Sequence, residues 1–173
     1  MTDSFAHNLR IDRIRDGQRI DLVADEAERK AIAERLDLDG LDRLEAHATL
    51  TREGDLIRAE GRLAASLAQR CVITRDPVAS HVDEPFTLSF QREPNSYAPD
   101  EEIELASDEL DTIFYDGGEI DLGSAIADTL ALSLDPFPRS AGAEAALKEA
   151  GVMSEERAGP FAALAKLRGG DES

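Results

Sequence analysis

The sequence predicts an α+β fold, in which an antiparallel β-sheet or partly open barrel of about four to six strands packs against three or four helices. Two patterns support this prediction. Apolar residues alternate with a period of two over long stretches between Leu44 and Phe90. Helical patterns precede and follow that region, and an acidic loop interrupts the second half of the chain. A length of 173 residues suits one compact domain with a tail.

The first 40 residues contain one extended and one helical pattern. Residues 8–23 read as an extended segment. Asp25 and Glu28 then form a capping pair that opens an amphipathic helix continuing to about Leu38. The predicted apolar stripe of this helix consists of Ala27, Ala31, Ile32 and Leu36.

The middle of the chain predicts a long β-hairpin and one more strand. Residues 44–50 alternate so that Leu44, Ala46, Ala48 and Leu50 share a face, residues 52–55 form a turn, and a second strand runs from Leu56 to about Val72. Another alternating stretch extends from Val82 to Phe90. Its Pro85 indicates an edge position or a bulge, because proline cannot donate a ladder hydrogen bond.

The second half begins with a predicted solvated loop over residues 91–104. A short strand at 113–115, a turn at 116–118 and an N-cap at Asp121 should follow, leading into a helix that carries Leu122, Ile126, Leu130 and Leu134. A short Ala-rich helix is expected at 143–150, and Phe161, Leu164 and Leu167 form an apolar stripe after Pro160. We therefore expect a single domain over 1–139 and a helical tail over 140–173 docked on it.

Charge is distributed unevenly along the chain. The net charge is −18, and residues 93–138 contain 13 acids and no Lys or Arg. Such a segment repels a phosphate polymer such as DNA and attracts a basic protein or the basic face of a ribonucleoprotein. The predicted partner-binding residues are the acids at its centre, namely Asp100, Glu101, Glu102, Glu104, Asp108, Glu109 and Asp111.

No pattern in the sequence predicts catalysis, a metal site or a cofactor. Cys71 is the only cysteine, which excludes an intramolecular disulfide or a multi-cysteine zinc site. A nucleophilic pairing of Cys71 with His47 or His81 is conceivable across strands, but a lone strand cysteine is usually a small buried hydrophobe. The acids at 100–104 lack the spacing of a calcium loop, and there is no glycine-rich phosphate cradle.

Sequence features also predict the compartment. The N-terminus does not read as a secretory signal, and no apolar run reaches the roughly 20 residues of a membrane span. A cytoplasmic protein without a membrane partner is therefore expected.

Arginines in the second predicted strand provide an RNA-binding alternative. Arg58 and Arg62 share a strand face, and Arg70 joins them if no bulge intervenes. They would form a modest basic stripe for contact with RNA. The competing interpretation is that they pair with neighbouring carboxylates on a solvated face.

Three ordered stretches carry a family resemblance: residues 69–78 (QRCVITRDPV), residues 120–123 with 130–139 (IDLG and LALSLDPFPR), and residues 160–167 (PFAALAKL). Together they resemble the YceD-like family of large ribosomal RNA subunit accumulation proteins, over about residues 10–168. The motif residues are Gln69, Arg70, Cys71, Asp76, Pro77, Asp121, Asp135, Pro136, Pro138 and Arg139. The family commonly has Cys-x-x-Cys at the first motif, and Ala68 in the first place here argues against a metal there.

The resemblance implies a non-enzymatic role in accumulation of 23S ribosomal RNA and biogenesis of the large subunit. Combined with the charge, it predicts that the acidic segment binds a basic ribosomal protein or a large-subunit precursor. Direct binding of rRNA through the arginine stripe is the alternative. A scaffold that docks a partner through the terminal apolar stripe is a third hypothesis.

Overall fold

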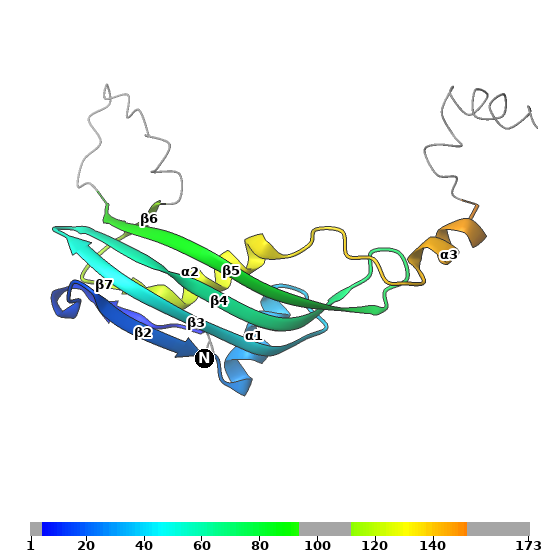
Figure 1. Cartoon of the computed structure of the whole chain (residues 1–173), viewed down its shortest axis with the longest axis horizontal. Helices are drawn as coiled ribbons and strands as arrows, with labels where there is room; N and C mark the ends of the chain where they lie inside the picture. The colour runs from blue at the N-terminus through cyan, green and yellow to red at the C-terminus, as the bar shows by residue number, and fades with distance from the viewer. Residues whose placement is uncertain (1–4, 94–111, 152–173) are drawn as a thin grey trace, which may run out of the picture. The chain divides into compact units, whose positions relative to one another are not determined.

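The structure is a computed structural model that describes residues 5–93 and 112–151 (Figure 1). The described chain divides into two compact units. The larger unit comprises residues 5–69, 79–93 and 112–136, and the smaller unit comprises residues 70–78 and 137–151.

The larger unit is built on a five-stranded sheet with the strand order β2-β3-β4-β5-β6. Its strands are β2 (Gln18–Val23), β3 (Gly40–Glu53), β4 (Leu56–Arg70), β5 (Pro77–Arg92) and β6 (Thr112–Tyr115). The β2-β3 and β3-β4 pairs are antiparallel, whereas β5 and β6 are parallel. The sheet is open and does not close into a barrel, so the predicted α+β class and its sheet alternative are confirmed.

A second, two-stranded sheet pairs β1 (Asn8–Arg10) with β7 (Glu119–Asp121). A 3₁₀ helix over Ile11–Arg13 and a turn at Gly17, whose φ is +73°, separate β1 from β2. The prediction of one extended segment over residues 8–23 was therefore wrong. Its two halves belong to different sheets, because β1 is held by a strand more than 100 residues away.

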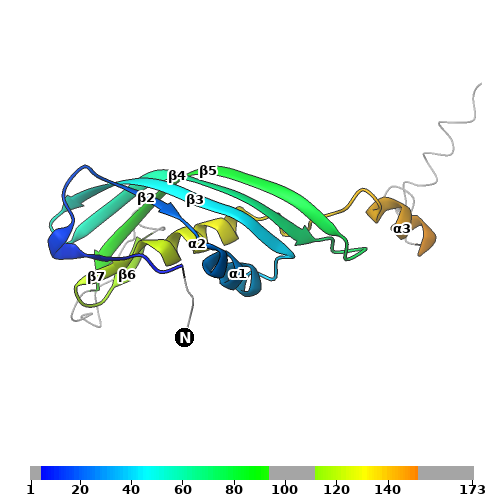
Figure 2. The same cartoon turned by 90° about the horizontal axis from the view of Figure 1, so that it is seen from below.

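Two helices, α1 (Glu26–Arg35) and α2 (Leu122–Ser133), lie on one side of the sheet (Figure 2). The predicted capping pair of α1 is confirmed: the Glu28 N–H donates to Asp25 Oδ1 over 2.9 Å, and the Asp25 N–H donates to Glu28 Oε2 over 2.8 Å. The predicted stripe is partly wrong, since Ala27 is exposed and the buried residues of α1 are Ile32 and Ala33. The helix ends before Asp37, whose φ is +52°.

The core lies between the sheet and these helices. The four predicted residues of β3, from Leu44 to Leu50, are all buried and face alternate residues of β4. The helix α2 contributes Leu122, Ile126 and Leu130, each with 0% of its surface exposed. The predicted hairpin and the predicted second helix are thus confirmed.

Pro85 lies where β5 has an open side. The strand β6 pairs only with Ser89–Arg92, so within the described residues no strand covers β5 at Pro85 on that side. Proline lacks the N–H that a ladder hydrogen bond needs, so it occurs in strands where one side is uncovered. The predicted edge position is confirmed locally.

The smaller unit contains the β4–β5 connection, residues 137–142 and helix α3 (Ala143–Glu149). The predicted Ala-rich helix is confirmed, and it ends before Gly151, whose φ is +73°. The apolar stripe of residues 161–167 lies outside the described residues. The predicted boundary after residue 139 and the docking of the tail stay predictions.

Candidate functional site

The centre of the acidic segment falls outside the described part of the chain. All seven predicted partner-binding acids, from Asp100 to Asp111, lie in residues 94–111. The described acids of the segment are Glu93, Asp116, Glu119, Asp121, Asp128 and Asp135.

Two of these acids are engaged within the larger unit. The Asp121 carboxylate accepts hydrogen bonds from the backbone N–H groups of His7 and Ser124, each at 3.0 Å, and from the Ser124 hydroxyl at 2.6 Å. Burial raises the pKa of Asp121, but these hydrogen bonds outweigh it and hold the pKa below its usual range. Asp121 is the predicted N-cap of α2, and Asp128 on the same helix pairs with Arg35 at 3.1 Å.

Three exposed acids gather around Tyr115 at one end of the sheet. The Tyr115 hydroxyl donates to the carbonyl of Asp55 over 2.6 Å, and the Glu93 N–H donates to the carbonyl of Tyr115 over 3.1 Å. Asp116 follows Tyr115 directly, so Asp55, Glu93 and Asp116 form what we call the acidic end. Arg92 lies at the same end and donates to the carbonyl of Gly117 over 3.4 Å. The last four residues of β5 pair with β6 there, and Arg92 is opposite Tyr115 (Figure 1).

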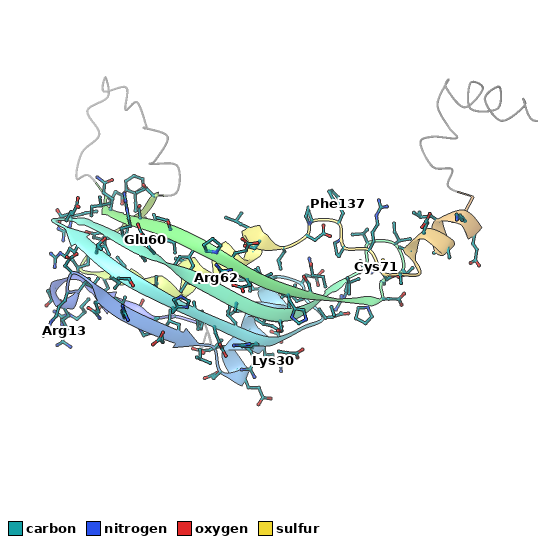
Figure 3. The ribbon with its side chains drawn as sticks, in the orientation of Figure 1. Arg13, Lys30, Glu60, Arg62, Cys71 and Phe137 are labelled. Carbon is teal, nitrogen blue, oxygen red and sulfur yellow. The ribbon has the colours of Figure 1, made fainter. Side chains whose placement is uncertain are left out.

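The predicted arginine stripe lies on the exposed face of β4. Arg58 and Arg62 alternate with buried residues and therefore share that face, with Glu60 between them (Figure 3). Arg62 Nε donates to Asp83 Oδ1 of β5 over 2.6 Å, and this hydrogen bond raises the pKa of Arg62. Arg70 is the last residue of β4 and belongs to the smaller unit. Carboxylates thus interrupt the stripe, as the competing ion-pair interpretation predicts.

A hollow of about 370 Å³ lies on this same face of the sheet. It is crossed by a row of polar side chains, because Asp21 is opposite His47 and His47 is opposite Arg62 in the strand register. Its charged lining consists of Asp21, Arg43, Glu45, Arg62 and Asp83, of which Arg43–Glu45 and Arg62–Asp83 are ion pairs. Because four of these five charged groups are paired with each other, we expect the hollow to attract a charged ligand only weakly.

The family-motif residues meet in two places. In the larger unit, the Gln69 side chain is buried and its Nε2 donates to the carbonyl of Asp135 over 2.8 Å. In the smaller unit, the Val72 N–H donates to the carbonyl of Pro138 over 2.9 Å. The end of β4 and the residues after α2 are therefore joined through motif positions that are 66 residues apart.

Cys71 is the centre of the smaller unit. Its side chain is 0% exposed, and Sγ accepts hydrogen bonds from the backbone N–H groups of Thr74 at 3.4 Å and Ser140 at 3.3 Å. The hydroxyls of Thr74 and Ser140 are 2.9 Å apart, and the Cys71 N–H donates to the carbonyl of Asp76 over 2.8 Å. The turn itself covers Val72–Thr74, and the roles of Thr74 and Ser140 were not predicted from the sequence.

Among the described contacts, Cys71 Sγ is hydrogen-bonded to backbone N–H groups and not to a histidine. The groups on Sγ come from Thr74 and Ser140, and Nδ1 of His81 lies 3.1 Å from the Ser66 hydroxyl. The described thiol is therefore organised as a hydrogen-bond acceptor inside a loop structure.

These contacts predict a pH dependence for the smaller unit. Burial raises the pKa of Cys71, but the hydrogen bonds from Ser140 and Thr74 outweigh it and lower the pKa from 9.0 to about 6. A thiol with a lowered pKa stabilises the fold above its unfolded pKa and loses that contribution as the pH falls through the folded value. The melting temperature of the wild type should therefore rise relative to that of Cys71→Ala between pH 6 and pH 9.0.

Thermal melts of both proteins across this pH range measure the effect, because the other titrating groups are common to both. A constant difference between the two melting temperatures would contradict a stabilised thiolate.

Two searches of the described residues concern metals and membranes. Among residues 5–93 and 112–151, no group of three or more His, Cys, Asp or Glu side chains is placed to hold a metal ion. None of the described helices has the length and apolar character needed to cross a membrane.

These features define an α+β protein with an open sheet, a strongly acidic surface and a smaller unit organised by hydrogen bonds. The chain belongs to the YceD family, because the family model described as large ribosomal RNA subunit accumulation protein YceD matches residues 59–168. The predicted family resemblance is confirmed, and the match includes all three motif stretches. No curated protein and no solved structure matches the chain. The family description connects the chain with accumulation of large-subunit ribosomal RNA and names no reaction.

Proposed function

We propose that the chain is a non-enzymatic factor that supports 23S rRNA accumulation by binding a basic ribosomal protein or a large-subunit precursor through its acidic surface. The observation that carries this proposal is the 13 acids in residues 93–138 without one Lys or Arg. A basic ribosomal protein would have its Lys and Arg side chains shielded there until rRNA displaces the factor.

The described surface supports an electrostatic mode of binding. The larger unit contains 22 acids and 12 basic residues among its described positions. Asp55, Glu93 and Asp116 of the acidic end are exposed, and residues 93 and 112 at that end flank the seven acids of 94–111. A cationic polypeptide would be steered to this end over about 10 Å at moderate ionic strength.

Neutralising the central acids tests the proposal. The variant Asp100→Asn, Glu101→Gln, Glu102→Gln, Glu104→Gln should lower capture of ribosomal proteins or precursor particles about tenfold or more at low salt, since the steering field is lost. Pull-down with the tagged full chain, followed by mass spectrometry, measures the capture.

A matched control removes the same number of charges elsewhere. The variant Glu26→Gln, Glu34→Gln, Asp42→Asn, Glu84→Gln changes exposed acids of the larger unit that do not belong to the acidic end, and it should retain capture. Equal losses in both variants would show that net charge, and not the acidic segment, is responsible. If the wild type captures neither ribosomal proteins nor precursors at low salt, the proposal is wrong.

The RNA-binding alternative predicts the opposite response. Charge reversal by Arg58→Glu and Arg62→Glu would then weaken the complex, whereas neutralising the four central acids would not. Arg62 already donates a hydrogen bond to the Asp83 carboxylate, so fewer of its N–H groups are available to bind a phosphate.

A further inference from the structure

The smaller unit differs in charge from the rest of the protein. Its two loop segments, residues 70–78 and 137–142, contain three arginines and one acid, whereas the described larger unit has 22 acids and 12 basic residues. The arginines are Arg70, Arg75 and Arg139, and all three are exposed. These two described loop segments of an acidic protein therefore carry a net positive charge, and their three arginines lie within the family-motif stretches.

Hydrogen bonds bring two of these arginines together from distant parts of the chain. The Thr74 and Ser140 hydroxyls are 2.9 Å apart, and the Ser140 N–H donates to Cys71 Sγ over 3.3 Å. Arg75 follows Thr74 and Arg139 precedes Ser140, so the two arginines extend from adjoining backbone. The buried thiol and the two hydroxyls hold the backbone beside both arginines in place.

Exposed apolar side chains lie beside the arginines. Phe137 is 69% exposed and Val72 is 44% exposed, and the Val72 N–H donates to the carbonyl of Pro138 over 2.9 Å. Pro138 itself is buried and anchors the segment, while Phe137 points outward from these loops (Figure 3). An exposed aromatic ring thus belongs to the same short loop segment as Arg139.

The backbone at Arg75 gives a further reason to assign a role to its side chain. Its φ is +68°, a conformation that costs an arginine free energy and that glycine adopts readily. The Arg75 N–H donates to the carbonyl of Cys71 over 3.0 Å, and the neighbouring contacts hold the turn in place. Backbone strain of this kind is tolerated where a side chain serves a function.

We propose that this surface of the smaller unit binds unpaired RNA. The guanidinium groups of Arg75 and Arg139 would hold phosphates, and a base would stack on Phe137. Positive charge with an exposed ring suits single-stranded RNA, whereas a basic protein would be repelled by the arginines.

Fluorescence anisotropy with the purified full-length protein tests the proposal without any ribosomal protein present. The probe is a labelled, unstructured RNA of about 12 nucleotides at about 50 mM salt. Phe137→Ala should weaken binding about 5- to 150-fold, because one stacked base is lost. Arg75→Gly should weaken binding and reduce the salt slope by about 0.7, while its melting temperature stays equal to or above that of the wild type.

Two matched variants serve as controls. Leu132→Ala removes an apolar side chain that is 90% exposed on α2, and Arg58→Ala removes an exposed arginine of β4; both should bind RNA like the wild type. The proposal is wrong if the wild type does not bind the RNA, or if Arg58→Ala weakens binding as much as Arg75→Gly. It is also wrong if Phe137→Ala leaves RNA binding unchanged.

Discussion

Gly61→Ala is expected to destabilise the protein by about 3 kcal/mol or more, because the new methyl group has no space in the sheet. Gly61 lies in the middle of β4 and is paired with Ala48 of β3. A Cβ at this position would overlap the backbone carbonyl of His47 and lie 2.9 Å from Cα of Ala48. Both neighbours are backbone atoms of a paired strand, so they cannot move aside without breaking the β3–β4 pairing.

Urea denaturation of the two proteins measures this loss. Gly40→Ala is the matched control, since Gly40 is also a strand residue, has an ordinary φ, and a Cβ there would meet nothing within 4 Å. Gly40→Ala only reduces the conformational entropy of the unfolded chain, so it should change the free energy of unfolding by less than about 1 kcal/mol. Equal stability of the two variants would show that β3 and β4 do not approach each other this closely.

The parts of the fold that could be predicted are those with strong local patterns. The hairpin of β3 and β4 has a period of two over many residues, and the start of α1 has its own capping residues in sequence. The β1–β7 pair could not be predicted, because it joins short segments more than 100 residues apart. The parallel pairing of β6 with β5 could not be predicted either, because a four-residue strand has no sequence pattern that indicates its direction in the sheet.

The sequence allowed several residues of the candidate site to be identified, but it did not predict which of them contact each other. Motif positions such as Gln69, Cys71 and Asp121 were identified from the family resemblance, and Asp121 also from its capping position. Thr74 and Ser140 were missed because no spacing rule connects hydroxyls 66 residues apart. The role of Asp100 to Asp111 stays a prediction that rests on charge.

Leu130→Ala is the second large effect, with an expected loss of about 2–5 kcal/mol. Leu130 has no exposed surface and belongs to the core between α2 and the sheet. Removing its branched side chain leaves a cavity that the long strands cannot collapse to fill, because their register is fixed by pairing along the whole hairpin. Thermal and urea unfolding measure the loss.

Leu132 provides a control on the same helix, two positions away and 90% exposed. Leu132→Ala removes the same atoms from a side chain already in water, so its stability should stay within about 0.5 kcal/mol of the wild type. The difference between the two variants isolates burial, because helix propensity and composition change equally in both. Similar losses at both positions would mean that α2 presents a different face to the sheet.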